Sequence, residues 1–298
     1  MPTYRGGRHE HGQNYLIDSH TITTLIGAVA ESRGPIIEIG PGRGALTHRL
    51  AALGRPLTAV EIDPRNAAAL RRELTAPSGG PSVEIVTADF LRWHLPAGRC
   101  VIVGNLPYHL TTAMLRHILP IPHWQEAVLL VQWEVARRRA GVGGASMMTA
   151  QWWPWIDFTL LGRVPRSAFR PMPSVDGGML RMTRRAAPLL AESDRRAYRG
   201  FVHAVFTGRG RGLPEILSRI VGQRARQAVK GWLAREGLGA STLPKDLSAE
   251  QWAALYALVA GCGWSPRGGI GSRGDRSRGG RSRGGRSRGG RSRAGGRR

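Results

Sequence analysis

The stretch IIEIGPGRGALT, residues 36–47, decides the fold of this chain, because an apolar run passes through three closely spaced glycines into a helix-like segment. Glycines at positions 40, 42 and 44 let the backbone turn tightly and approach a ligand closely. A helix that begins at such a loop presents unpaired N–H groups at its N-terminus. This order of strand, glycine loop and helix predicts a nucleotide-binding α/β domain.

Two acids follow at the ends of the next two apolar runs. Glu61 lies 19 residues after Gly42, where a carboxylate can bind ribose hydroxyls. Asp89 could accept a hydrogen bond from an adenine amino group, with Ile62 and Phe90 on either side of the ring. Gly40 and Gly42, followed by two acids, favour S-adenosylmethionine. GPGRGA nevertheless also satisfies the dinucleotide fingerprint G-x-G-x-x-A, so a nicotinamide enzyme stays an alternative.

Between residues 36 and 183, β-like runs alternate with helix-like ones, which predicts a parallel, doubly wound sheet. Asp63 and Pro64 supply an N-cap and a first-turn proline for one of the helices. The last two strands have no clear helix between them and are expected to form an antiparallel hairpin at one edge. The predicted strands are IIEI (36–39), LTAVEI (57–62), VEIVTA (83–88), VIVG (101–104), AVLLVQ (127–132), FTLLGRV (158–164) and GGMLRM (177–182).

The composition changes twice along the chain, which predicts three parts. Residues 1–185 are expected to form the Rossmann-like domain. Residues 186–265 show helical patterns without strand signals, including a Ser248–Gln251 capping box, and predict a small all-helical RNA-binding domain. Residues 266–298 repeat RSRGG and have too few apolar residues to form a core, so we expect a disordered tail.

The net charge of +24 indicates a polyanionic partner. Residues 267–298 hold twelve Arg and one Asp, a net charge of +11, which leaves +13 for the rest of the chain. RNA or DNA is favoured over a membrane, because no basic amphipathic helix stands out. Solubility alone is the alternative reading, although an acidic surface would serve that purpose equally well.

The sequence GNLPY, residues 104–108, comes where a fourth strand ends. Methylating an exocyclic amine requires hydrogen-bond acceptors that stabilise the charge developing on nitrogen. The side-chain oxygen of Asn105 and the backbone carbonyl of Leu106 could be those acceptors. Pro107 stiffens the turn, and Tyr108 offers a face on which an extruded base can stack. A turn with a buried tyrosine is the structural alternative.

These motifs together resemble the ribosomal RNA adenine N6-methyltransferases, and most closely the Erm group. The resemblance implies an α/β, Rossmann-like, S-adenosylmethionine-dependent methyltransferase that modifies one adenine of 23S ribosomal RNA in the peptidyl-transferase region. Such enzymes confer macrolide–lincosamide–streptogramin B resistance. The Arg/Gly tail and residues 132–155 resemble Erm enzymes of antibiotic-producing actinomycetes. The matching motifs are QNYLID (13–18), EIGPGRGALT (38–47), VEID (60–63), ADF (88–90), NLPYHLTTAML (105–115) and FRPMPSVDG (169–177).

The resemblance also implies roles for single residues. Asn14 and Leu16 would contact S-adenosylmethionine from the N-terminal segment, and Gly40 would lie against its methionine part. Asn105 would meet both the methyl donor and the target amine, and Tyr108 with Phe169 would clamp the target base. A basic surface for RNA would map to residues 137–139, which could also be a solvated helix face. His109 stands where many members have Asn, with no expected effect on the reaction.

Other functions stay open on the sequence alone. A small-subunit ribosomal RNA adenine dimethyltransferase of ribosome maturation shares nearly every motif and is the main alternative. A DNA adenine methyltransferase more often carries Pro-Pro-Tyr or Pro-Pro-Phe after Asp or Asn. An inactive RNA-binding protein would have no need for Glu61 or for the Asn105–Tyr108 motif.

The remaining features set bounds on the protein. Two cysteines allow neither a disulfide framework nor a cysteine-rich metal site, and the histidines form no ligand spacing, so no metal is expected. The polar N-terminus lacks a signal pattern, and no apolar run approaches the roughly 18 residues of a membrane span. We expect a cytoplasmic monomer.

Overall fold

The computed structural model describes residues 14–74 and 82–265, and all of them belong to one compact unit. The predicted tail, residues 266–298, and the first thirteen residues lie outside the described residues. The predicted boundary between two domains at residues 185 and 186 stays a prediction.

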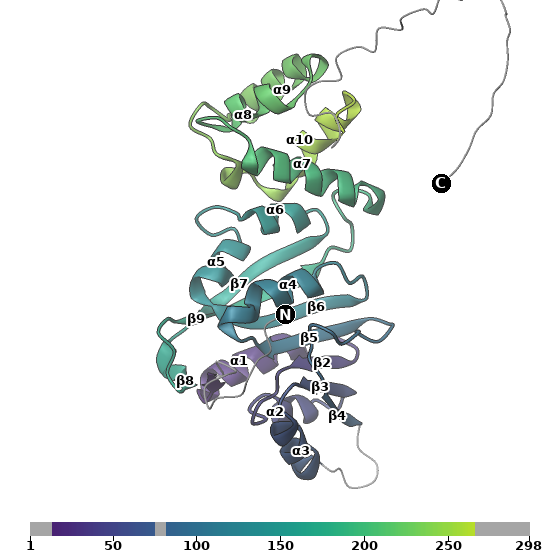
Figure 1. The fold of residues 1–298 in the computed structure, drawn as a ribbon, viewed down its shortest axis with the longest axis vertical. Coiled ribbons are helices and arrows are strands. Elements are labelled where there is room, and N and C mark those ends of the chain that lie inside the picture. The colour runs from purple at the N-terminus through teal and green to yellow at the C-terminus, as the bar shows by residue number, and fades with distance from the viewer. Residues whose placement is uncertain (1–13, 75–81, 266–298) are drawn as a thin grey trace, which may run out of the picture. The chain divides into compact units, whose positions relative to one another are not determined.

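A seven-stranded sheet forms the centre of this unit, with the strand order β4-β3-β2-β5-β6-β9-β7 (Figure 1). The strands β4, β3, β2, β5 and β6 are parallel, as predicted, and β9 runs antiparallel to both of its neighbours. In sheet order the strands are β4 (Val83–Thr87), β3 (Leu57–Glu61), β2 (Ile36–Ile39), β5 (Cys100–Asn105), β6 (Trp124–Gln132), β9 (Gly177–Arg184) and β7 (Ile156–Val164).

Apolar residues cover both faces of the sheet. On one face Ile36 packs with Leu25 of α1, and on the other Ile102 packs with Leu115 of α4. All four residues of β2 are buried, as expected for a central parallel strand. Asp63 caps α3 by accepting a hydrogen bond from the Arg65 N–H at 2.8 Å, as predicted. The helices of this region are α1 (Ser19–Ala30), α2 (Thr47–Ala51), α3 (Pro64–Glu73), α4 (Thr111–Ile118), α5 (Trp133–Arg139) and α6 (Met147–Trp152).

The predicted antiparallel hairpin at one edge of the sheet is confirmed, but the later strand is the inner one. β9 pairs with both β6 and β7, so β7 forms the edge. The burial patterns explain this order. The first four residues of β9 are buried, whereas the middle of β7 is partly exposed, so β9 fits the interior position better.

The described part of the stretch after β9 contains helices and no strand, as predicted. Ser248 and Gln251 form the expected capping box at the start of α10. Tyr198 lies edge-on to Trp155 with ring centroids 5.5 Å apart, which joins the core of these helices to that of the sheet. The α-helices of this stretch are α7 (Arg195–Thr207), α8 (Leu213–Ile220), α9 (Gln223–Arg235) and α10 (Ala249–Gly261). It also contains the 3-10 helices η3 (Glu192–Asp194) and η4 (Pro244–Asp246), whereas η1 (Tyr108–Leu110) and η2 (Arg166–Ala168) lie earlier in the chain.

A second, two-stranded sheet was not predicted. β1 (Tyr15–Leu16) pairs antiparallel with β8 (Phe169–Arg170), and the Ile17 N–H donates to the carbonyl oxygen of Ala168 at 2.9 Å. We call β1 together with Asn14 the strap. Within the described residues, no helix combines the length and apolar character needed to cross a membrane.

Candidate active site

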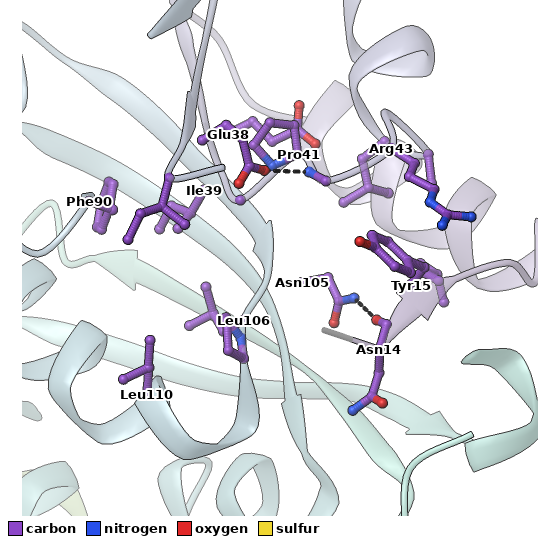
Figure 2. Close-up of a pocket in the computed structure, with 18 of the residues that line it drawn as sticks. Asn14, Tyr15, Glu38, Ile39, Pro41, Arg43, Phe90, Asn105, Leu106 and Leu110 are labelled. Carbon is purple, nitrogen blue, oxygen red and sulfur yellow. Dashed lines mark hydrogen bonds between the residues drawn. The ribbon is translucent and has the colours of Figure 1, made fainter. Parts of the chain in front are cut away.

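A cavity of about 430 Å³ opens where β2, β3, β4 and β5 end (Figure 2). This volume falls within the range of roughly 300–1,000 Å³ that is usual for small-molecule sites. Neighbouring parallel strands bring their carboxyl ends to one edge of the sheet, so motifs far apart in sequence meet there. Nine predicted cofactor-binding residues line the cavity: Asn14, Leu16, Gly40, Gly42, Glu61, Ile62, Asp89, Phe90 and Asn105.

The glycine loop is held in place by Glu61. One carboxylate oxygen of Glu61 accepts a hydrogen bond from the Gly42 N–H at 2.8 Å, and the other accepts from the Asp63 N–H at 2.8 Å. Gly40 and Gly42 adopt φ values of +63° and +56°, which disfavour other residues. A Cβ atom at Gly40 would point into open space, so this glycine leaves room for a ligand against the backbone.

Glu38 is a buried acid beside this loop that the sequence reasoning missed. It is 1% exposed, lines the cavity, and one of its carboxylate oxygens has no hydrogen-bond partner in the described structure. Burial raises the pKa of Glu38 to about 8, with a smaller opposing effect of the Thr47 hydroxyl and a smaller supporting effect of Glu61. The sequence signal that could have identified Glu38 is its place as the one acid in the apolar run IIEI, residues 36–39.

Asp89, Ile62 and Phe90 lie together on the β3–β4 side of the cavity. One oxygen of Asp89 accepts a hydrogen bond from the Leu91 N–H at 3.0 Å, which fixes the turn after β4. Phe90 is buried and meets the ring of His117 edge-on at 5.5 Å. Ile62 is 49% exposed, so part of its apolar surface is open to solvent.

The Asn105–Tyr108 motif continues from β5 into the 3-10 turn η1. The Asn105 side-chain nitrogen donates to the backbone carbonyl oxygen of Asn14 at 2.8 Å, which turns its side-chain oxygen away from that contact (Figure 2). The Leu106 N–H donates to the Leu130 carbonyl oxygen at 2.9 Å. Asn105, Leu106, Pro107 and Tyr108 all line the cavity.

Tyr108 is half-buried, and its hydroxyl group has no hydrogen-bond partner in the described structure. Burial raises the pKa of this hydroxyl to about 12, and the negative charge of Asp176 adds to the shift. The tyrosine is therefore neutral, and its ring rather than its hydroxyl is the group available for contact with a ligand.

Phe169 differs from the other predicted site residues in its placement. It is 0% exposed and is absent from the cavity lining. It lies behind Tyr108, edge-on, with ring centroids 6.5 Å apart. In this arrangement Phe169 supports Tyr108, and its expected role as one side of a base clamp stays a prediction.

The strap forms part of the cavity wall and contacts the end of β5 through the hydrogen bond from Asn105 to Asn14. The Tyr15 ring approaches the Gly42 backbone so closely that a Cβ atom there would lie 3.0 Å from it. The guanidinium group of Arg43 stacks on the same ring at 4.7 Å (Figure 2). Both residues line the cavity and were not predicted. The place of Tyr15 depends on the pairing of β1 with β8, which brings it to Arg43.

The predicted basic surface at residues 137–139 is less uniform than its sequence indicates. Arg138 is exposed. Arg137 lies 3.9 Å from Glu134. Arg139 donates to the Ser146 hydroxyl oxygen at 2.5 Å, and burial lowers the pKa of its guanidinium. Ser146 in turn caps α6, so Arg139 has a structural contact rather than a free surface position.

The sheet order and the cavity define a Rossmann-like methyltransferase fold. The sequence pattern of the family described as "Ribosomal RNA adenine dimethylase" matches residues 5–260, and the chain belongs to this family.

Three relatives are informative. An "rRNA adenine N-6-methyltransferase" of Corynebacterium diphtheriae is 57% identical over 219 residues, which cover 74% of this chain and 85% of the relative. The "Mycinamicin-resistance protein MyrB" of Micromonospora griseorubida is 44% identical over 263 residues, which cover 88% and 82%. The crystal structure of the 23S rRNA methyltransferase ErmE aligns with a TM-score of 0.74 and 36% identity, over 83% of this chain and 100% of that one.

The residues present fit S-adenosylmethionine. Gly40 leaves open space beside the backbone, and buried carboxyl groups at Glu38 and Glu61 suit a ligand with cationic and hydroxyl groups. Ile62 and Phe90 supply apolar surface for an adenine ring. Within the described ranges, no group of three or more His, Cys, Asp or Glu side chains could hold a metal ion.

Proposed function

We propose that this protein transfers a methyl group from S-adenosylmethionine to N6 of one adenine in 23S ribosomal RNA. Methylation of that base would block the binding of macrolide, lincosamide and streptogramin B antibiotics, and so give resistance. The observation that carries the proposal is the Asn105–Tyr108 turn at the wall of the cavity, in a chain closely similar to MyrB and ErmE.

S-adenosylmethionine supplies a methyl group that is already activated by the sulfonium, so the protein needs no strong base. In the proposal, Glu61 binds the ribose hydroxyls, and Asp89 accepts a hydrogen bond from the adenine amino group. Ile62 and Phe90 hold the adenine ring between them. Gly40 and Asn14 border the methionine part.

Asn105 and Leu106 have the central role toward the target amine. Their carbonyl oxygens accept hydrogen bonds from its two N–H groups, which favours a pyramidal nitrogen and stabilises its developing positive charge. The hydrogen bond from Asn105 to Asn14 supports this role, because it occupies the amide nitrogen and leaves the amide oxygen for the target. The Tyr108 ring stacks on the extruded base.

We further propose that the target adenine lies in the peptidyl-transferase region and that the enzyme acts as a cytoplasmic monomer. The second candidate function is methylation of small-subunit ribosomal RNA during ribosome maturation. The shared motifs keep it as an alternative, but the similarity to MyrB and ErmE favours the large subunit.

The test uses purified protein, labelled S-adenosylmethionine and protein-free large- and small-subunit ribosomal RNA, with primer extension to locate the modified base. We expect label in the large-subunit RNA and a single stop at one adenine. An Asn105→Ala variant serves as the inactive control. Label confined to small-subunit RNA would establish the second candidate, and absence of label from both would contradict both assignments.

A further inference from the structure

A depression between α6 and α7 is separate from the active site and has no role in the proposed reaction. It shares no residue with the catalytic cavity. Figure 1 shows α6 and α7 side by side, above α5 and the sheet, and the two helices contact each other. The residues that line the depression are Gln151, Glu192, Ser193, Arg195, Arg196, Arg199, Gly200 and His203.

Two arginines of α7 are held on one tryptophan at the end of α6. The Arg195 guanidinium lies 5.4 Å from the centroid of the Trp152 ring, and that of Arg199 lies 4.9 Å from it. Trp152 is itself buried, so this platform is fixed by the core. Stacking orients a guanidinium plane while leaving its N–H edge available for a ligand. Within the tryptophan-rich stretch at residues 152–155, Trp152 therefore positions these two arginines.

Positive charge in the depression exceeds the available negative charge. Glu192 is the one acid in its lining, and it already forms an ion pair with Arg195. Within residues 14–74 and 82–265, neither Arg196 nor Arg199 lies within ion-pair distance of a carboxylate. An anion placed there would compensate charges that the protein leaves uncompensated.

The pKa values of two arginines in this region are lowered, with Arg195 as one of the causes. Burial, and then the charge of Arg195, lowers the pKa of Arg199. Burial likewise lowers the pKa of the nearby Arg184 to about 10, with Arg195 again adding to the shift. The Nε–H group of Arg195 is buried and has no partner in the described structure. Arg195 thus adds positive charge near both groups, as the second cause after burial.

The shape of the charged surface favours an extended anion. Arg196, Arg199 and His203 are spaced at i, i+3 and i+7, so they share one side of α7 over about 10 Å. That length exceeds a single phosphate group. The planar fork of arginine matches phosphate oxygens, and the chain without residues 267–298 still carries a net charge of +13.

We propose that the depression between α6 and α7 binds the sugar-phosphate backbone of RNA at a distance from the methylated base. The inference rests on the proposed function, because it takes the RNA substrate from there. Contacts to phosphate groups do not discriminate between base sequences. Such a site would instead fix the position of a larger RNA on the protein.

The experiment compares the Arg196→Ala/Arg199→Ala variant with wild type, and with an Arg49→Ala/Arg224→Ala control that removes two exposed arginines elsewhere. Binding of protein-free 23S ribosomal RNA is measured across a salt series. For each lost phosphate contact, we expect the magnitude of the slope of log affinity against log salt to fall by roughly 0.7–0.9 in the depression variant. The control is expected to change the slope less. Arg196→Ala alone, at an exposed position, keeps the test valid if the double variant folds poorly.

Steady-state kinetics separate this inference from the proposed function. A short RNA fragment that carries the mapped adenine should be methylated by both variants with wild-type kcat and KM. The depression variant should show a raised KM only for the full-length RNA. An unchanged salt slope and KM for full-length RNA would overturn the site, and would leave an acidic protein as the partner to test. An equal rise of KM for the short fragment would overturn its separation from the catalytic RNA path.

Discussion

The side-chain nitrogen of Asn105 donates a hydrogen bond to the backbone carbonyl oxygen of Asn14 at 2.8 Å, although 91 residues separate the two in sequence. This contact joins the strap to the motif at the end of β5. It also decides which way the Asn105 amide faces, since only its nitrogen can donate. The orientation of one side chain therefore depends on a short segment near the N-terminus.

Asn105→Asp should reduce methyl transfer by at least about 100-fold while leaving the fold intact. The substitution keeps the side-chain oxygen but replaces the NH2 donor with a second oxygen, so that a carboxylate faces the carbonyl of Asn14. Single-turnover methylation measures the loss, and circular dichroism checks the fold. A variant with near wild-type turnover would contradict the role of the amide.

Tyr108→Phe should retain activity, whereas Tyr108→Ala should lose about 10- to 100-fold. The ring supplies stacking of roughly 1–3 kcal/mol. Among the residues that the structure describes, the hydroxyl has no hydrogen-bond partner that its removal could affect. The two kcat/KM values with RNA, together with thermal unfolding, test this. Loss of activity in Tyr108→Phe would show that the hydroxyl takes part in the reaction.

Phe169→Ala should lower the free energy of unfolding by about 3–5 kcal/mol, because the ring is fully buried behind Tyr108. Phe169→Leu should recover most of that stability and, if the ring only supports Tyr108, most of the activity. Urea unfolding and methylation assays on both variants separate support from direct contact. A stable but inactive Phe169→Leu enzyme would instead indicate that the ring stacks on the base.

Glu38 should make the protein less stable as pH rises. Its pKa is about 8 when folded, against an ordinary value of 4.5, so the folded state retains a proton that the unfolded state has lost. The contribution of Glu38 to the free energy of unfolding is full below about pH 4.5, falls between pH 4.5 and 8, and is constant above pH 8. Urea unfolding between pH 5 and 8 should show a flatter profile for Glu38→Gln than for wild type. Parallel profiles would contradict the raised pKa.

Deletion of residues 267–298 should weaken RNA binding and reduce its salt dependence, because the segment carries a net charge of +11. Methyl transfer at saturating RNA should be unchanged. Filter binding over a salt series and the value of kcat test the two parts separately. A fall in kcat would mean that the tail does more than raise the local concentration of RNA.

Local sequence chemistry was sufficient to predict the strand ends and much of the cavity. A glycine run after a strand, an acid at the end of the next strand and a rigid Asn-Leu-Pro-Tyr turn each have few structural uses. Parallel strands then bring them together without further information. For this reason Gly40, Glu61 and Asn105, which lie far apart in the sequence, line one cavity in the structure.

Features that depend on distant pairing could not be predicted in the same way. The position of β9 between β6 and β7 reflects the relative burial of two similar apolar runs. Phe169 was expected at the base, but the pairing of Leu16 with Phe169 accompanies its burial behind Tyr108. Arg139 was expected on a basic surface because the sequence does not show its contact with Ser146. That contact depends on the path of the loop between the two residues.

The pairing of β1 with β8 has a consequence for how the enzyme would respond to change. Tyr15 and Leu16 line the cavity proposed for the methyl donor. Phe169, the strand partner of Leu16, lies edge-on to the Tyr108 ring that is proposed to stack on the target base. In the proposed function, this one pair of strands would border the sites of both ligands. A substitution that loosens it would weaken the apparent affinity for donor and acceptor together, even where the altered side chain contacts neither.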